Sequence, residues 1–455
     1  MERTLINQTP KLVGQKVKVA GWVHAIRSHG KIAFLDLRDR SGLLQVFISK
    51  PESLKGIQDE TVAEIEGKVQ TRPEKMMNKE ISTGTVELFA ETIKILAKAE
   101  VLPFDLRELN VTLPTLLDFR ALTLRNEKVK DIFKVQEFLM EGFRKISQEL
   151  GCTEIFVPTI SASATEGGAE VFKVNYYGYP AYMTQSPQLY KQIMVPIFER
   201  VYLVSHAYRA EPSVTTRHLS ESIQLDCEFG FVDFEELLDL LEKVGVAMLK
   251  NVEERCPEVL KDYGIEKIAF GKIPRLTLKE AQEIIYKETG KDVRREKDLG
   301  PEDEADICQW AKKEKGSDLV TITHYPTKKR AFYTMPDPKN PEYSLSYDLL
   351  FRGMEMASGS QRINDYQELI KTIKERGLDP KDFEIYLQAF KFGMPPEGGF
   401  SFGLERMTKN VLKLANVREA SLFPRDMERV DLRLSVLQPE KKDKKEKKQK
   451  NDEIN

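Results

Sequence analysis

Apolar and polar residues alternate along the first hundred residues in five runs, the pattern of half-buried β-strands. The runs are residues 16–27, 31–39, 43–49, 61–72 and 85–99. Turn signals such as His29-Gly30 and Ser82-Thr83-Gly84 separate several of them. Five short strands in about a hundred residues predict an OB-fold β-barrel, a common platform for single-stranded nucleic acid.

A helical pattern covers residues 129–150, with apolar residues at 132, 135, 139, 143, 146 and 150. This spacing places them on one face of an α-helix. The next segment, residues 152–158, is predicted to be a strand that ends at Pro158. A core helix packed on a sheet accounts for this pattern without any further role.

Two more alternating runs, residues 200–205 and 223–231, flank a charged loop and predict an antiparallel hairpin. Arg209 is expected on the first strand, and Glu211, Arg217 and His218 follow it towards the tip. Guanidinium groups keep their charge and bind phosphate oxygens in pairs, which suits a triphosphate. A solvated charged hairpin is the alternative for this segment alone.

A glycine-rich stretch at residues 398–406 leads into a helical pattern that includes Met407 and Val411. Glycine lets a nucleotide approach the backbone closely, and the amino end of a helix favours phosphate. Arg406 is therefore predicted to face the far end of ATP. An ordinary tight turn is the alternative.

The composition fits a large enzyme without requiring one. The 455 residues predict two or more domains, and 41% hydrophobic residues can bury a sizeable core. No apolar run approaches the ~20 residues that cross a bilayer, so we expect a cytoplasmic protein with no membrane association. The four cysteines are too scattered for a disulfide framework. Because the net charge is only −2, nucleic acid would have to bind local basic patches.

In this order, the helix and strand, the hairpin and the glycine-rich turn resemble motifs 1, 2 and 3 of the class II aminoacyl-tRNA synthetases. The resemblance implies an α+β fold, with a five-stranded OB-fold barrel before a catalytic domain built on an antiparallel sheet flanked by helices. It also implies a homodimer formed through motif 1. The implied boundaries are 1–102 for the anticodon-binding domain, 103–128 for a hinge, 129–438 for the catalytic domain with an insertion at about 235–330, and 439–455 for a disordered lysine-rich tail.

Within the family the chain resembles class IIb, and its short insertion resembles the archaeal or eukaryotic type. Phe34 followed by Gln45 matches the anticodon-binding face of class IIb, with Arg38 nearby. An aromatic ring stacks on an unstacked base and a glutamine amide can bind its edge, although Phe34 also fits a barrel core. His24 resembles enzymes that charge tRNA(Asn) as well as tRNA(Asp), and a surface histidine without consequence is the alternative.

The amino-acid pocket resembles that of the aspartyl enzymes, because Lys191 and Arg362 together favour an anionic side chain. We expect these two cations to lack an acceptor of their own, so the amide hydrogens of an asparagine would face donors that stay poorly paired. The implied aspartate-binding residues are Glu166, Gln188, Leu189, Tyr190, Lys191, Arg209, Ser358 and Arg362. Glu166 belongs to a Thr-Glu-Gly-Gly segment that resembles the family's mobile loop.

The resemblance also implies ATP as a substrate and Mg²⁺ held by Glu355 and Ser358, which need no dedicated metal cage. The implied ATP-binding residues are Arg209, Ala210, Glu211, Arg217, His218, Leu219, Glu355, Gly403, Leu404, Glu405 and Arg406, with Arg209 and Arg406 catalytic. The expected reaction joins L-aspartate to tRNA(Asp), and by hypothesis to tRNA(Asn), through aspartyl-adenylate. An asparaginyl enzyme and a non-catalytic OB-fold RNA-binding paralogue are the alternatives.

Overall fold

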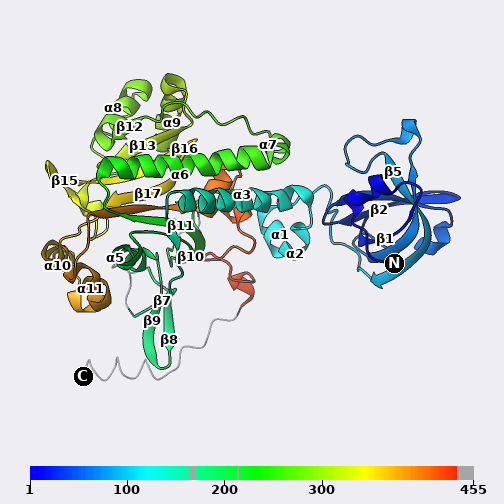
Figure 1. Ribbon diagram of the computed structural model, residues 1–455, viewed down its shortest axis with the longest axis horizontal. Coiled ribbons are helices and arrows are strands. Elements are labelled where there is room, and N and C mark those ends of the chain that lie inside the picture. Colours follow the sequence, from blue (N-terminus) through cyan, green and yellow to red (C-terminus); the bar gives the residue numbers. More distant parts are fainter. Residues whose placement is uncertain (163–169, 213–214, 438–455) are drawn as a thin grey trace. The chain divides into compact units, whose positions relative to one another are not determined.

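The computed structural model describes residues 1–162, 170–212 and 215–437 (Figure 1). The chain divides into two compact units, Met1–Leu109 and Asn110–Asn455, and each unit is described by itself. In the described part of the chain, no helix is both long and apolar enough to cross a membrane.

The first unit is a closed five-stranded barrel with the strand order β1-β2-β3-β5-β4. Its strands are β1 (Lys16–His29), β2 (Ile32–Asp39), β3 (Gly42–Ile48), β4 (Val62–Thr71) and β5 (Val86–Ala97). Short 3₁₀ helices accompany them: η1 (Ile6–Leu12), η2 (Pro51–Leu54) and η3 (Glu74–Met76). The predicted OB-fold barrel is confirmed, with every strand ending within two residues of its expected limits. In β2, Ala33, Leu35 and Leu37 are fully buried while the residues between them face outward, as period-two alternation requires.

The second unit is built on an eight-stranded sheet of order β12-β13-β16-β17-β18-β11-β10-β6. Its strands are β6 (Thr153–Glu154), β10 (Arg200–Tyr208), β11 (Glu221–Gly230), β12 (Arg275–Thr277), β13 (Leu319–Thr323), β16 (Ser346–Phe351), β17 (Met354–Gln361) and β18 (Glu397–Gly403). The central strands pair antiparallel, and only the outermost pairs, β12 with β13 and β6 with β10, run parallel. Two small sheets contain β7 (Ile160–Ser161), β8 (Lys173–Tyr176) and β9 (Tyr179–Met183), and β14 (Pro336–Asp337) and β15 (Asn340–Ser344). The expected antiparallel sheet is confirmed.

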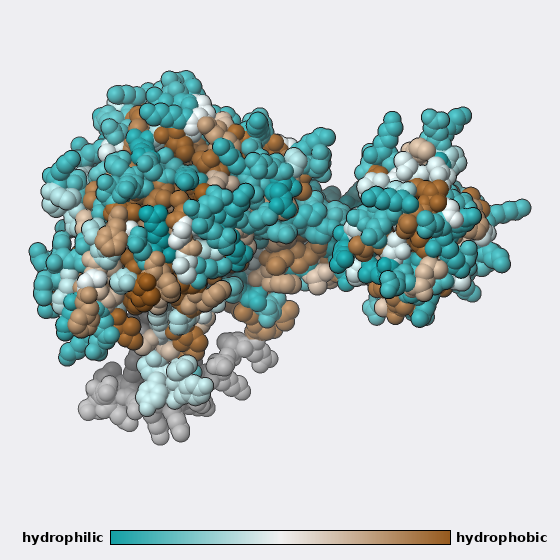
Figure 2. Space-filling model, in the orientation of Figure 1, coloured by the Kyte–Doolittle hydropathy of each residue, from teal (hydrophilic) through white to brown (hydrophobic). Residues whose placement is uncertain are grey.

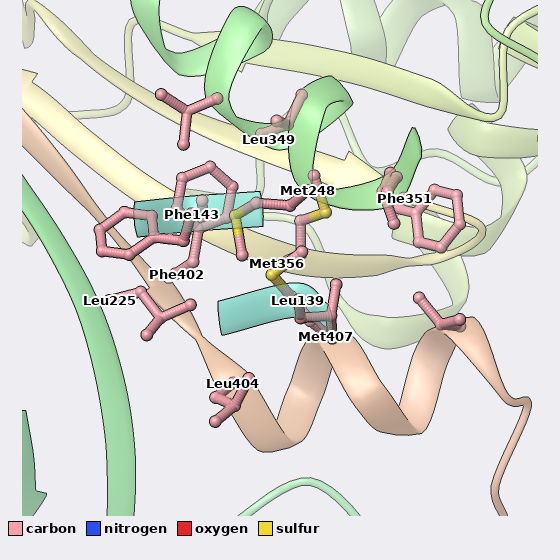
Figure 3. Close-up of a cluster of buried hydrophobic side chains, with 14 of the residues drawn as sticks. Leu139, Phe143, Leu225, Met248, Leu349, Phe351, Met356, Phe402, Leu404 and Met407 are labelled. Carbon is pink, nitrogen blue, oxygen red and sulfur yellow. The ribbon is translucent and has the colours of Figure 1, made fainter. Parts of the chain in front are cut away.

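Two long helices, α3 (Glu127–Glu149) and α6 (Phe234–Arg255), pack against each other and against the sheet (Figure 1). Asn126 caps α3 through its side chain, and Asp233 forms a capping box with Glu236 at the start of α6. Phe143 of α3 and Met248 of α6 lie in the core beside side chains of the sheet (Figure 3). Hydrophilic residues cover much of the face shown in Figure 2, in keeping with the 31% charged composition.

Shorter helices complete the second unit. They are α1 (Leu113–Asp118), α2 (Arg120–Thr123), α4 (Gln188–Ile193), α5 (Val195–Phe198), α7 (Pro257–Asp262), α8 (Leu278–Thr289), α9 (Pro301–Lys315), α10 (Tyr366–Glu375), α11 (Glu384–Lys391), α12 (Leu404–Val411), η4 (Thr327–Lys329), η5 (Pro380–Phe383), η6 (Val417–Ala420) and η7 (Leu434–Val436).

The motif 1 segment differs in part from its prediction. The helix is present as α3, and its apolar residues are buried in the core of the second unit. The strand expected at residues 152–158 contains only Thr153 and Glu154, and Phe156 beyond it is 88% exposed. The apolar spacing of the helix is therefore explained by packing within this chain.

The expected insertion lies inside the second unit, and so does the part of the expected hinge from Asn110 onward. Residues 235–330, expected as an insertion, include α6 in the core and β12 and β13 in the sheet. In the expected hinge, the buried Arg120 donates to the backbone carbonyls of Glu419, Ser421 and Leu422. Residues 110–128 are thereby tied to the rest of the second unit, while the expected tail at 439–455 lies outside the described residues.

The paired glycines of motif 3 serve packing, which corrects our expectation that they admit a nucleotide. A Cβ on Gly398 would collide with Leu237, and one on Gly399 would collide with the carbonyl oxygen of Cys227 and with Glu228. Of the three glycines in residues 398–406, only Gly403 could carry a Cβ without a collision, because that atom would make ordinary van der Waals contacts with Arg406.

We predict that Gly399→Ala destabilises the protein by about 3 kcal/mol, because the new methyl group overlaps backbone that cannot move without breaking the sheet. Gly403→Ala is the matched control, since its methyl group would make only ordinary contacts, and we expect little change in the free energy of unfolding. Urea denaturation of both variants checks this. Equal stabilities for the two variants would contradict the packing role of Gly399.

Candidate active site

A cavity of about 460 Å³ lies in the second unit, lined by α4, the β10–β11 hairpin, β17 and the junction of β18 with α12. It brings together most of the residues that the sequence indicated for the two substrates. They are Gln188, Lys191, Arg209, Glu211, Arg217, His218, Leu219, Glu355, Ser358, Arg362, Gly403, Glu405 and Arg406.

Five expected site residues lie elsewhere or outside the described residues. Leu189 and Leu404 pack in hydrophobic clusters because they occupy the inward faces of their short helices. Tyr190 is half-buried and does not line the cavity, and the backbone N–H of Ala210 donates to the carbonyl oxygen of Glu170. Glu166 lies outside the described residues.

Three arginines define one end of the cavity. Arg209 follows the last residue of β10, one position beyond the strand on which it was expected, and its N–H still donates to the carbonyl of Ser220 across the hairpin. Its side chain is 44% exposed and lies 3.9 Å from Glu211. Arg217 pairs with Glu304 at 2.7 Å, and Arg406 lies 3.5 Å from Glu355. Two of these guanidinium groups come from the loop between β10 and β11 and one from α12, and all three line the cavity, as a site for a polyanion requires.

His218 shares this end of the cavity. Its Nδ1 lies 2.5 Å from the hydroxyl of Thr215, and its Nε2 lies 3.7 Å from Glu211. Burial lowers the pKa of His218, and Arg406, Arg209 and Arg217 lower it further against the opposing effect of Glu211. At neutral pH the imidazole is therefore mainly neutral and can form hydrogen bonds without adding charge.

The two residues expected to hold a metal lie on β17. In a regular strand, residues three positions apart point to opposite faces. A β-bulge leaves Met356 unpaired, because Ala357 pairs with Leu349 while Glu355 pairs with Leu350, and it returns Glu355 and Ser358 to the same cavity. Their spacing is therefore that of a bulged strand.

The oxygen atoms of Glu355 and Ser358 are of the kind that Mg²⁺ prefers, and they fit a site completed by phosphate and water. Among the residues that the structure describes, no group of three or more His, Cys, Asp or Glu side chains could hold a metal by itself.

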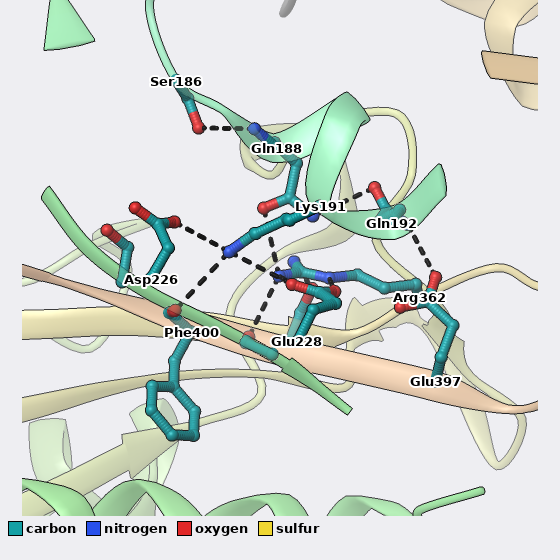
Figure 4. A network of polar contacts seen from close by, with 12 residues as sticks. Ser186, Gln188, Lys191, Gln192, Asp226, Glu228, Arg362, Glu397 and Phe400 are labelled. Carbon is teal, nitrogen blue, oxygen red and sulfur yellow. Dashed lines mark hydrogen bonds and ion pairs between the residues drawn. The ribbon is translucent and has the colours of Figure 1, made fainter. Parts of the chain in front are cut away.

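The opposite end of the cavity is a buried charge cluster (Figure 4). Gln188 and Lys191, three residues apart on α4, point to the same side. The Nζ of Lys191 lies 2.9 Å from Asp226 and 3.1 Å from Glu228, and Arg362 donates from Nε to Glu228 at 2.8 Å. This corrects our expectation that Lys191 and Arg362 lack acceptors, because carboxylates of β11 already neutralise both of them.

The expected anticodon residues lie on the barrel. Phe34 is half-buried on the outer face, with its ring 5.7 Å from that of Phe47, which stacks on Phe89. On the same face, the amide of Gln45 donates to Glu87 at 2.8 Å and accepts a weak 3.5 Å contact from Arg27.

Two further barrel residues are differently placed. Arg38, expected near Phe34 and Gln45, is buried and forms an ion pair with Glu60 at 3.0 Å. His24 occupies a β-bulge in β1, between residues paired with Leu37 and Asp36. Its pKa is lowered by burial and then by the charge of Arg38.

Comparison with known proteins agrees with this geometry. Residues 112–427 match the family model for tRNA synthetases class II (D, K and N), and residues 17–96 match that for an OB-fold nucleic acid binding domain.

The chain belongs to the class II aminoacyl-tRNA synthetases. It is 41% identical to a Thermus thermophilus protein named Aspartate--tRNA(Asp/Asn) ligase, over 94% of this chain and 99% of the relative. A Pyrococcus horikoshii protein named Aspartate--tRNA(Asp) ligase is 37% identical over 93% and 97%. The solved structure of asparaginyl-tRNA synthetase from Pyrococcus horikoshii with asparaginyl-adenylate superposes with a TM-score of 0.87 and 31% identity, over 94% and 99%.

Three acidic residues of the synthetase's site were missed by the sequence analysis. Asp226 and Glu228 occur in a strand that is buried on both faces, so no polar alternation marks them. Glu304 comes from α9, nearly ninety residues after the arginine with which it pairs. Burial raises the pKa of Glu304 to about 7, against the opposing effect of Arg217.

Glu405 of the synthetase joins motif 2 to motif 3. It is 5% exposed, and its carboxylate accepts a hydrogen bond from the backbone N–H of Ile223 in β11. Burial raises its pKa to about 7, from an ordinary value of 4.5. The side chain lines the cavity and also holds α12 to β11.

We predict a pH-dependent stability from this carboxyl. Between about pH 4.5 and 7 the folded protein keeps a proton that the unfolded chain has released, so the contribution of Glu405 falls as the pH rises. Glu405→Gln keeps an acceptor for Ile223 and does not titrate. Its free energy of unfolding relative to wild type should therefore increase by about 2 kcal/mol between pH 5 and 8.

Urea unfolding at both pH values measures this difference. Glu242→Gln serves as the control, because Glu242 forms an ion pair with Arg275 outside the cavity. Parallel pH profiles for wild type and Glu405→Gln would show that Glu405 ionises in the folded protein as it does in the unfolded chain.

Proposed function

We propose that this synthetase attaches L-aspartate to tRNA in two steps through aspartyl-adenylate. The observation that carries the proposal is the pair of buried cations, Lys191 and Arg362, which meet at Glu228 on the floor of a cavity whose other end holds three arginines. Full-length relatives named as aspartate ligases support the same substrate. The side-chain carboxylate of aspartate would bind to Lys191 and Arg362, while the phosphates of ATP would extend towards the three arginines at the other end of the cavity.

The first step needs no general base, since the α-carboxylate of the amino acid is already ionised at neutral pH. Arg209, one residue beyond a rigid strand, would bind the α-phosphate where charge accumulates as that carboxylate attacks. Arg217, His218 and Arg406 would hold the β- and γ-phosphates. Catalysis on this scheme comes from positioning and fixed charge.

Glu355 and Ser358 would hold Mg²⁺ together with phosphate oxygens and water. When bound, the ion supplies positive charge to the leaving pyrophosphate. Glu355 lies 3.5 Å from Arg406, so the carboxylate and the guanidinium are direct neighbours in the cavity.

In the second step the 3′-hydroxyl of the terminal adenosine of tRNA would attack the activated carbonyl, which forms the aminoacyl ester and breaks the bond to the phosphate, releasing AMP. The barrel would bind the anticodon, with Phe34 as the stacking surface and Gln45 as the edge-binding amide. Because the amide of Gln45 is held by Glu87, its orientation is fixed before tRNA arrives.

We propose that both tRNA(Asp) and tRNA(Asn) are acceptors. His24 lies at a bulge, a feature that often re-aims a side chain near a functional surface, and a bulkier residue would narrow the space for the third anticodon base. The relatives differ on this point, since one is named for both tRNAs and another for tRNA(Asp) alone.

We also propose a homodimer that uses the segment after α3. The apolar face of α3 is already buried, whereas Phe156 is 88% exposed beside the two-residue edge strand β6. An exposed aromatic side chain at a sheet edge is a suitable contact for a second subunit.

An asparaginyl enzyme is the second candidate. It is favoured by the pairing of both cations with carboxylates, which reduces the net positive charge available to an acidic substrate. Lys191 argues against it, because an amide side chain offers a single oxygen to two cationic groups.

Pyrophosphate exchange with aspartate, asparagine and lysine side by side tests the proposal. We expect exchange with aspartate at least tenfold faster than with the other two amino acids. Arg209→Gln should lower aspartate-dependent exchange about 10²-fold or more, because it removes a charge that acts on the α-phosphate in the transition state. Preferred activation of asparagine would favour the second candidate, and near-normal exchange by Arg209→Gln would refute the role of Arg209.

Charging of purified tRNA(Asp) and tRNA(Asn) with aspartate tests the acceptor range. We expect the two catalytic efficiencies to agree within about tenfold. His24→Trp should reduce the charging of tRNA(Asn) more than that of tRNA(Asp). A strong wild-type preference for tRNA(Asp) would eliminate the broader specificity.

A further inference from the structure

The buried cluster beneath the amino-acid end of the cavity contains three acidic side chains and two basic ones. Lys191 and Arg362 supply the positive charges, and Asp226, Glu228 and Glu397 are the acids. Glu397 is fully buried, and Figure 4 shows it beside Arg362 with a hydrogen bond to Gln192. If all three acids were ionised, the cluster would carry one net negative charge directly beneath an anionic substrate.

Glu397 differs from the other two acids in its partners. Its Oε1 accepts a hydrogen bond of 2.6 Å from the amide of Gln192 on α4. The carbonyl of that amide accepts hydrogen bonds from Tyr386 at 3.2 Å and from Gln188 at 3.0 Å. Within the described residues no Lys, Arg or His side chain forms an ion pair with Glu397, and its Oε2 is buried without a hydrogen-bond partner.

An ionised carboxylate without a cation is costly in such a place, because burial removes its hydration and nothing replaces it. A neutral carboxylic acid has an O–H to donate, and the adjacent Glu228 is an acceptor. Burial raises the pKa of Glu397 well above its ordinary range, and Glu228 raises it further. Burial alone would also raise the pKa of Glu228, but Arg362 and Lys191 lower it to about 2. One carboxyl therefore keeps a proton while its neighbour stays ionised.

We propose that Glu397 is a positioning residue that sets the charge of the amino-acid pocket by holding a proton between its carboxyl group and Glu228. The proton makes the five-residue cluster neutral, so Lys191 and Arg362 can attract the side-chain carboxylate of the substrate. The shared hydrogen bond also fixes Glu228, which in turn orients Arg362 through Nε. This inference rests on the proposed function, because it concerns preference for aspartate over asparagine.

Glu397 is connected to the lining of the cavity through neighbouring residues. Gln192 connects it to Gln188, and Glu228 connects it to Arg362. Gln188 lines the cavity and accepts a hydrogen bond from Arg362 at 3.2 Å. Glu397 itself does not line the cavity. Its replacement should therefore change the binding of the amino acid and leave the phosphate end unaffected.

Two substitutions at Glu397 distinguish the role of its hydrogen bonds from the role of its volume. Glu397→Gln keeps an oxygen for Gln192 and places an N–H donor towards Glu228, so the cluster stays neutral. Glu397→Leu fills a similar volume but removes both polar contacts, so the amide N–H of Gln192 loses its acceptor and Glu228 loses the shared proton, while Glu228 keeps its ion pairs with Lys191 and Arg362. The Leu variant also leaves the cluster neutral, but it loses the two hydrogen bonds that the Gln variant retains.

The test is pyrophosphate exchange at neutral pH. For each variant we would measure KM for aspartate, KM for ATP and the inhibition constant of asparagine. Thermal melting checks that each variant is folded. Glu397→Gln should keep KM for aspartate within about twofold of wild type. Glu397→Leu should raise it about tenfold or more. For both variants KM for ATP and the inhibition constant of asparagine should change less than about threefold, which a general collapse of the cavity would not allow.

Three outcomes decide the matter. Equal damage in the Gln and Leu variants would show that an ionised carboxylate is required, and a normal KM for aspartate in the Leu variant would show that Glu397 has no role. Either result overturns this inference while wild-type activation of aspartate still stands. If the wild-type enzyme does not activate aspartate at all, the proposed function itself fails.

Discussion

The pairing of Lys191 and Arg362 through Glu228 is the interaction on which the amino-acid site depends. Each cation is almost completely removed from water, so burying either charge would be very costly without a carboxylate within hydrogen-bond distance. The pair also joins three elements, since Lys191 comes from α4, Glu228 from β11 and Arg362 from the residue after β17. The same contacts that define the pocket thus hold its walls together.

The sheet supports this cluster through close backbone approach. β11 lies between β10 and β18, and Gly399 of β18 faces Glu228 across the strand pair. The absence of a side chain at Gly399 is what lets Glu228 reach both cations. Behind the sheet, α3 and α6 bury their apolar faces in the common core, so the strands that carry the site cannot shift independently.

Much of the architecture could be predicted because it follows local rules. The barrel strands were placed within two residues from period-two alternation, and α3 from its apolar spacing. Arg209, Arg217, Arg362 and Arg406 could be named because each belongs to a short motif with a distinctive spacing.

Other features depend on contacts that sequence does not encode locally. Asp226 and Glu228 are polar residues in a strand buried on both faces, so alternation gave no indication of them. The bulge at Met356 that aligns Glu355 with Ser358 arises from pairing with another strand. Arg38 was expected near Phe34 and Gln45, but its buried ion pair with Glu60 could not be predicted, because Glu60 lies in a different segment of the chain.

The account rests on where the side chain of the amino acid binds, and a crystal structure with a non-hydrolysable aspartyl-adenylate analogue would observe this directly. We predict that the side-chain carboxylate lies about 3 Å from both Lys191 Nζ and the guanidinium of Arg362, with the phosphate beside Arg209. A complex in which the carboxylate contacts neither cation would contradict the central claim.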